Sequence, residues 1–174
     1  MSRIVLNEEI HEVVFKDLIP SAKRFVWIAT ADIKDLHYQR TARKFDTFLA
    51  LFDDLVTEGV EIRLVHAKEP GPRFREDFDR FPNLVKSDLF ARVLCPRNHM
   101  KCVIVDGQQA FLGSANLTGA GMGAKSPQRR NFECGMLLED EQSVARLMDM
   151  FDQLFIGEFC PECGRREVCP DPIC

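Results

Sequence analysis

Two side chains that could do chemistry stand two residues apart near the middle of the chain. His99 and Lys101 precede an apolar run, Cys102–Val105, that is typical of a buried strand. Successive side chains of a strand point to opposite faces, so residues two apart lie on the same side. We therefore expect an imidazole, which can act as base or nucleophile, and a fixed positive charge in one pocket.

The apolar run ends at a dipeptide that favours a tight turn. Asp106 and the glycine after it tolerate positive φ, and a second apolar run follows at residues 110–112. A hairpin here would bring the polar groups of Ser114 and Asn116 back beside the histidine and the lysine. A nucleophile, a cation and two neutral hydrogen-bonding groups form a set suited to holding a phosphate without a metal ion.

The spacing of these residues resembles the HKD motif of the phospholipase D superfamily. Every position of its pattern, H-x-K-x4-D-x6-G-S-x-N, is occupied, by His99, Lys101, Asp106, Gly113, Ser114 and Asn116. The similarity is strongest over residues 98–135. It implies a metal-independent phosphodiesterase in which His99 attacks phosphorus to form a phosphohistidine, with no cofactor for catalysis. Lys101, Ser114 and Asn116 would bind the non-bridging oxygens.

The same resemblance suggests roles for two acidic residues. Glu133 lies in an otherwise apolar stretch, where members of the superfamily often carry an acidic residue that orients the histidine. A simple surface carboxylate is the alternative for Glu133. Asp106 matches the aspartate of the motif, and its place in the turn is as compatible with a structural role as with a chemical one.

The resemblance also implies a homodimer. The family mechanism uses two histidines, and larger relatives carry two motifs in one chain, whereas this chain carries one. His11, His37 and His66 lack the residues that accompany His99. We therefore expect two copies to join about a two-fold axis, so that both His99 side chains face one phosphate.

The substrate has to be inferred from the residues around the site. Basic residues that could form a phosphate track, or be solvated loop charges, are Arg73, Arg75, Lys125, Arg129 and Arg130. We expect an endonuclease acting on DNA or RNA. The alternatives are a phospholipid phosphodiesterase of the cardiolipin-hydrolase kind and a non-catalytic nucleic-acid-binding module. The lack of a basic amphipathic helix counts against a bilayer as substrate.

Composition limits these functions further. The 174 residues are 45% hydrophobic and 29% charged, which is ordinary for a soluble globular domain. The formal net charge is −4, so any binding of a polyanion must come from a local patch. The first residues lack the apolar core of a signal peptide, and no apolar run could span a bilayer. We expect a cytoplasmic protein without a membrane anchor.

Four of the seven cysteines crowd the last residues of the chain. They form a C-x2-C knuckle followed by two more thiols and are Cys160, Cys163, Cys169 and Cys174. Four thiolates suit a closed, structural zinc site; an iron–sulfur cluster or unliganded thiols are the alternatives. We expect a catalytic domain over residues 1–157 and a zinc-binding tail over residues 158–174.

The remaining pattern predicts an α/β fold. A strand at 24–29, a helix from Thr41 to Gly59 and a strand at 61–65 make a βαβ unit, which favours a parallel pair. Further predicted elements are a helix capped by Asn7 and ending near Pro20, a short helix at 73–81, strands at 92–95 and 132–138, and a last helix capped by Asp140. The expected architecture is a phospholipase D-like mixed sheet with helices on both faces. A glycine-rich loop at 118–128 would border the site.

Overall fold

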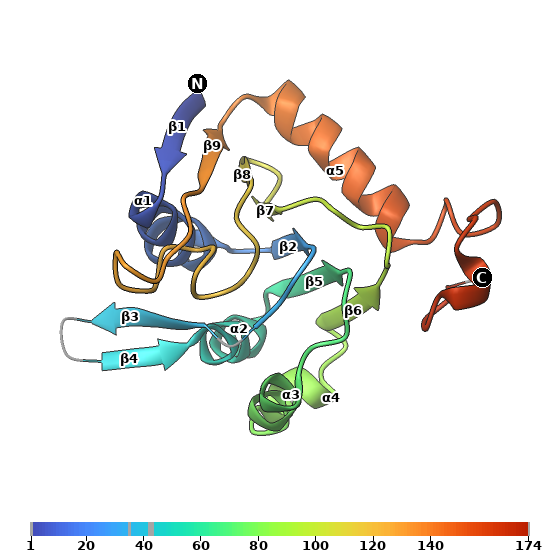
Figure 1. Cartoon of the computed structure of the whole chain (residues 1–174), viewed down its shortest axis with the longest axis horizontal. Helices are drawn as coiled ribbons and strands as arrows, with labels where there is room; N and C mark the ends of the chain where they lie inside the picture. The colour runs from blue at the N-terminus through green and yellow to red at the C-terminus, as the bar shows by residue number, and fades with distance from the viewer. Residues whose placement is uncertain (1, 35, 42–43, 174) are drawn as a thin grey trace.

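The structure is a computed structural model that describes residues 2–34, 36–41 and 44–173 (Figure 1). In chain order its main elements are β1 (Ser2–Leu6), α1 (Glu8–His11), β2 (Phe25–Thr30), β3 (His37–Thr41), β4 (Lys44–Thr47), α2 (Phe48–Thr57), β5 (Glu61–His66), α3 (Pro72–Phe78), α4 (Pro82–Lys86), β6 (Phe90–Leu94), β7 (Cys102–Val105), β8 (Gln109–Gly113), β9 (Cys134–Leu138) and α5 (Glu141–Phe155). A π-helical segment, Glu12–Leu18, and a 3-10 turn, Ile19–Ser21, continue α1.

Seven strands form one mixed sheet in the order β1-β9-β8-β7-β2-β5-β6. The β2–β5 and β5–β6 pairs are parallel, as the βαβ pattern predicts, and the other pairs are antiparallel. One end of the sheet therefore gathers the C-terminal ends of β2, β5, β6 and β8 and the N-terminal starts of β7 and β9. We call this the site edge, because His99 and Asn116 both lie there.

Helices cover both faces of the sheet, as predicted. On one face the helical segment after α1 and helix α2 pack on a core that includes Phe15, Phe52 and Ile62. On the other face α5 crosses the sheet diagonally and buries Val144 and Phe151 (Figure 1). Helix α5 starts where predicted, since the Asp140 carboxylate accepts the Ser143 N–H at 2.8 Å. Two apolar layers thus hold the sheet between them.

Two local predictions were wrong because tertiary contacts compete with the sequence pattern. The helix expected from Thr41 begins only at Phe48, because the Thr47 hydroxyl caps it by accepting the Ala50 N–H. The chain before it forms the β3–β4 hairpin instead. Asn7 does not cap α1, since its side chain accepts the Glu133 N–H at 3.1 Å. Strand β1 and helix α4 were not predicted.

The β7–β8 hairpin forms where the Asp106-Gly107 dipeptide predicts it, with φ of 55° and 70° at these two residues. The Asp106 carboxylate accepts the backbone N–H groups of Lys23, Arg24 and Phe25 at 2.8, 2.8 and 2.9 Å. This turn lies at the far end of β7, opposite the site edge. Asp106 therefore anchors the hairpin to the start of β2, which is the structural one of the two roles considered for it.

We expect the Asp106 anchor to stabilise the fold. Burial alone would raise the pKa of Asp106. The hydrogen bonds from the three backbone N–H groups together outweigh this effect, so the pKa lies below its ordinary value. Asp106→Asn keeps the turn conformation but loses the charge, and it should lower the free energy of unfolding by about 2 kcal/mol at pH 7. The difference in the free energy of unfolding between Asp106→Asn and wild type should have its full size above the ordinary carboxyl pKa. It should shrink as the pH falls below about 4.

Urea unfolding at pH 7 and at pH 3 checks this expectation, with Gln108→Ala in the same turn as the control. An Asp106→Asn difference that is equally large at both pH values would contradict the assigned role of the carboxylate.

Candidate active site

The connection between β6 and β7 presents His99 at the site edge. Asn98, only 4% exposed, donates from Nδ2 to the carbonyl oxygens of Thr30 at 2.9 Å and Val65 at 3.2 Å. Its Oδ1 accepts the Met100 N–H at 3.1 Å. Asn98 thus ties the connection to the ends of β2 and β5 and leaves His99 exposed. The sequence pattern did not predict this role of Asn98. The available signal was its position as a polar residue directly before the motif.

The Lys101 ammonium lies against the His99 ring. Its Nζ is 2.9 Å from Nδ1 and 3.2 Å from Nε2, and it donates to the His99 carbonyl at 2.8 Å. An ammonium can only donate, so a ring nitrogen that it contacts must offer a lone pair. Lys101 is 9% exposed, and its burial lowers its pKa, while the charge of Glu133 acts in the opposite direction. The predicted base and cation therefore do share one site, although both precede β7 instead of lying within it.

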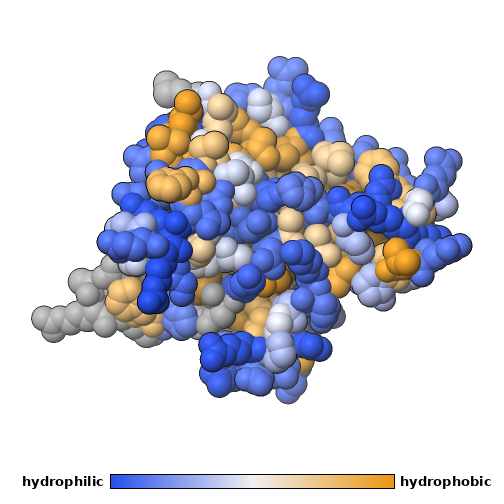
Figure 2. Space-filling model, in the orientation of Figure 1, coloured by the Kyte–Doolittle hydropathy of each residue, from blue (hydrophilic) through white to orange (hydrophobic). Residues whose placement is uncertain are grey.

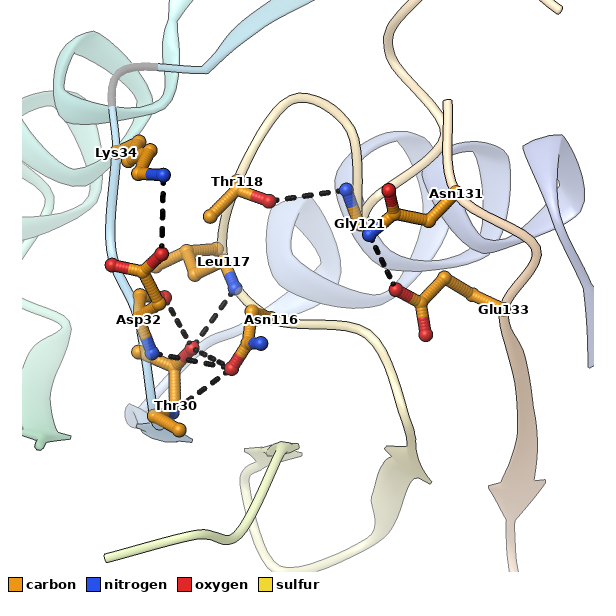
Figure 3. A network of polar contacts seen from close by, with 10 residues as sticks. Thr30, Asp32, Lys34, Asn116, Leu117, Thr118, Gly121, Asn131 and Glu133 are labelled. Carbon is orange, nitrogen blue, oxygen red and sulfur yellow. Dashed lines mark hydrogen bonds and ion pairs between the residues drawn. The ribbon is translucent and has the colours of Figure 1, made fainter. Parts of the chain in front are cut away.

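Asn116 is fixed by the loop that follows β2. Its Oδ1 accepts the backbone N–H groups of Ala31 at 3.1 Å and Asp32 at 3.2 Å (Figure 3). The Thr30 hydroxyl completes the network by accepting the Leu117 N–H at 2.9 Å and donating to the Asp32 carbonyl at 2.7 Å. The Nδ2 group of Asn116 has no partner within the part of the chain that the structure describes. It can therefore donate to a ligand.

Ser114 and Glu133 contact each other across β8 and β9. The Ser114 hydroxyl donates to the Glu133 carboxylate and accepts the Cys134 N–H at 3.1 Å. Asn131 Nδ2 donates to the other carboxylate oxygen at 3.0 Å (Figure 3). In the described part of the chain Glu133 makes no hydrogen bond or ion pair with the His99 ring, so the orienting role predicted for it is not seen. The pairing of β8 with β9 instead directs Glu133 toward Ser114.

The glycine-rich loop folds back over Asn116. The Gly121 N–H donates to the Thr118 hydroxyl at 3.0 Å (Figure 3), and a Cβ on Gly121 would lie 2.6 Å from the Asn116 carbonyl oxygen. No side chain fits at this close approach. The predicted loop beside the site is therefore present, and its glycine allows the contact.

The basic residues predicted to bind substrate are not gathered in one place. Arg130 forms an ion pair with Glu8 at 2.9 Å and is thus held toward α1. Arg129 is exposed on the glycine-rich loop, apart from the groove that Lys125 and Arg73 line. Of the three residues Lys125, Arg129 and Arg130, the structure brings Lys125 alone to this groove.

The other histidines have different surroundings. His66 is fully buried, with Nδ1 2.7 Å from the Lys68 carbonyl and Nε2 3.3 Å from the Arg92 guanidinium. Arg92 can only donate, so Nε2 accepts and Nδ1 carries the proton. Burial also lowers the pKa of His66. Both ring nitrogens are thus occupied, and His66 cannot be a second catalytic histidine. His11 is buried against Phe15.

The cysteine tail lies against the β6–β7 connection. Cys160, Cys163 and Cys169 line a small cavity of about 30 Å³ together with Cys95, a thiol that the sequence analysis did not connect with the tail. The Arg165 N–H and the Arg97 guanidinium stabilise the Cys163 thiolate and lower its pKa. Thiols of this kind suit zinc, but no three His, Cys, Asp or Glu residues in the described chain are arranged to hold a metal. Cys174 lies outside the described residues, so the zinc site stays a prediction.

Metal analysis of the freshly purified protein checks the zinc prediction. We expect about one zinc ion per chain, lost in Cys160→Ser and retained in Cys134→Ser, whose thiol lies on β9 outside the cavity. Iron in place of zinc would favour the cluster alternative. Protein that carries neither metal when isolated without chelators would contradict a metal site in the tail.

Comparison with known proteins places this site in a family. Residues 15–155 match the family described as cardiolipin synthase, PLD-like domain. The chain therefore belongs to the phospholipase D superfamily. Membership supports a hydrolase of the phosphodiesterase type. No curated protein sequence matches the chain.

Solved structures share the fold at low sequence identity. NucT from Helicobacter pylori matches 88% of this chain and 94% of its own, with 16% identity and a TM-score of 0.62. Nuc from Salmonella typhimurium, a phospholipase D family member, matches 88% and 92%, with 15% identity and a TM-score of 0.58. Phosphatidylserine synthase from Haemophilus influenzae matches 88% and 38%, with 16% identity and a TM-score of 0.62. These likenesses establish the fold.

No helix in the described part of the chain is long and apolar enough to cross a membrane.

Proposed function

We propose that the protein is a phosphodiesterase that cleaves DNA or RNA internally, through a phosphohistidine on His99 in a homodimer. The observation that carries this proposal is the contact between the Lys101 ammonium and the exposed His99 ring, at 2.9 Å from Nδ1. This contact requires a neutral His99 ring, because an ammonium can donate only to an unprotonated ring nitrogen, and it sets a positive charge beside the ring. Those are the two things that attack on a phosphodiester needs.

In the proposed reaction a His99 ring nitrogen attacks phosphorus, and the bond from phosphorus to the leaving oxygen breaks. Lys101 and the Asn116 amide nitrogen stabilise the charge on the non-bridging oxygens, while the Ser114 hydroxyl donates to Glu133. His99 of the partner subunit donates a proton to the leaving oxygen. It then takes a proton from the water that attacks the phosphohistidine, which restores both histidines.

Two histidines are needed, but each chain offers one in this environment. His66 is excluded by its two hydrogen bonds, and His11 is buried. His37 is exposed, but it lacks the lysine and the Gly-Ser-x-Asn residues that accompany His99. A two-fold axis near the exposed His99 would supply the second imidazole from an identical chain. This is why we propose a homodimer with one composite site.

Phospholipid cleavage is the second candidate, and one observation favours it. Apolar side chains line up across three neighbouring strands, where Ile4 faces Met136 and Met136 faces Leu112, and all three are at least 39% exposed. Figure 2 shows apolar surface over β1 and β9 in the upper part of the view. Such a row could touch lipid. The low sequence identity to phosphatidylserine synthase does not decide between lipid and nucleic acid.

The first test is hydrolysis of labelled single- and double-stranded DNA and RNA in EDTA. His99→Ala should lower the rate by about 10³-fold or more, because it removes the nucleophile. Gln108→Ala, at the opposite edge, should cleave like wild type. Circular dichroism in the same buffer verifies the fold, and phosphatidylglycerol and cardiolipin vesicles are assayed in parallel. A folded dimer that cleaves vesicle lipid but no nucleic acid would reverse the order of the two candidates.

Subunit mixing tests the composite site. If each site needs both copies of His99, dimers of one wild-type and one His99→Ala chain are inactive. After exchange in an equal mixture, about one quarter of the dimers are fully wild type, so activity per wild-type chain should fall by about half. Light scattering and exchange of a fluorescent label show that mixed dimers form. Undiminished activity per wild-type chain, with exchange verified, would show that each chain works alone.

A further inference from the structure

A groove of about 710 Å³ opens beside Asn116 at the site edge. Its walls come from three segments that are distant in the sequence: the loop after β2, the connection from β5 into α3, and the glycine-rich loop. Of its described charged residues, Lys34, Lys68, Arg73 and Lys125 are cationic, and Asp32 and Glu69 are acidic. The groove thus carries an excess of two positive charges, while the whole chain has a formal charge of −4.

Three of the four cations of the groove are available to a ligand. Asp32 forms an ion pair with Lys34 at 3.3 Å, and Glu69 is 4.0 Å from Arg92, so both carboxylates have other partners. None of Lys68, Arg73 and Lys125 has an ion-pair partner among the residues that the structure describes, and all three are exposed. Three unpaired cations from separate segments therefore face one hollow. This is the local patch that a chain of negative net charge needs in order to bind a polyanion.

The shape of the groove limits how it can recognise a ligand. Phe74 is 4% exposed and stacks with Phe48 and Phe78, so its ring is not available to stack on a base. A Cβ on Gly119 would lie 2.9 Å from Cε of Lys125, which shows that the lysine stem lies close over this glycine. His37 is the other aromatic ring in the described lining of the groove, against four cationic side chains. The groove therefore offers mainly charge to phosphates, and such contacts carry no sequence preference.

One wall of the groove is hydrogen-bonded to the segment that carries Asn116. The Asp32 N–H donates to Asn116 Oδ1 at 3.2 Å (Figure 3). The Lys34 N–H donates to the Leu117 carbonyl at 3.1 Å. One wall is thus bonded directly to the residues that follow the β8 strand. A chain whose phosphate lies beside His99 and Asn116 can continue into the groove.

We propose that this groove binds the phosphodiester backbone of a single nucleic-acid strand on one side of the phosphate that is cleaved. The inference rests on the proposed function. It adds to that function a substrate class, the single strand, and two further substrate-binding residues, Lys34 and Lys68. A single strand is flexible and can follow a hollow between loops. A duplex is stiff over about 150 base pairs and presents its phosphates on a convex surface, so it would meet only the rims.

Binding of a fluorescent 15-nucleotide strand to the dimer tests the proposal, with His99→Ala as the background so that the strand is not cut. Lys68→Ala combined with Lys125→Ala is compared with Lys86→Ala combined with Arg146→Ala. The control pair removes two exposed cations on α4 and α5, outside the groove. The groove pair should weaken binding about tenfold at low salt and reduce the slope of log K against log salt by about 1.4, while the control pair should change neither.

The same pairs are made in the wild-type background for kinetics. The ratio of kcat/KM for the strand to kcat/KM for a small soluble diester, bis(p-nitrophenyl) phosphate, should fall about tenfold in the groove pair and stay constant in the control pair. Groove-pair binding equal to that of the control, or a loss confined to duplex, would overturn the groove assignment. Failure of the proposed function is a separate result: no His99-dependent hydrolysis of either substrate, whether or not the groove binds the strand.

Discussion

The candidate site depends on the way two loops are bonded to the end of one central strand. Thr30, the last residue of β2, accepts Asn98 with its carbonyl oxygen and Leu117 with its hydroxyl. The first bond fixes the loop that carries His99, and the second fixes the loop that carries Asn116. Both motif segments are therefore held by hydrogen bonds to the same buried residue, Thr30. Their separation is set by the sheet and not by the loops, which is what a preorganised site requires.

The burial of Lys101 is a second consequence of this arrangement. A nearly buried ammonium is costly unless its donors are satisfied, and here the carbonyl oxygen and the ring of His99 satisfy it. The charge is thus held in place before any ligand arrives. The cost of ordering a flexible lysine is met by folding, so that substrate binding need not meet it.

Much of this could be predicted from the sequence, for reasons that are local. Turn chemistry predicted the hairpin at Asp106, and fixed spacing predicted that Lys101 lies beside His99. The partners of Asp106 and Glu133 could not be predicted, since they depend on strand order and on residues more than eighty positions away in the case of Asp106. The groove was missed for the same reason, because its walls come from three separate segments. Asn98 could have been suspected as a polar residue directly before the motif.

The close approach of Gly121 to the Asn116 carbonyl has a consequence for engineering the protein. Any side chain at this position must displace the backbone that carries Asn116, so the site constrains this part of the loop. A library intended to change substrate preference should therefore keep this glycine and vary the exposed stretch 125–129, which has no such contact with Asn116. The loop is in effect divided into a fixed half that supports the site and an outer half that is free to diversify.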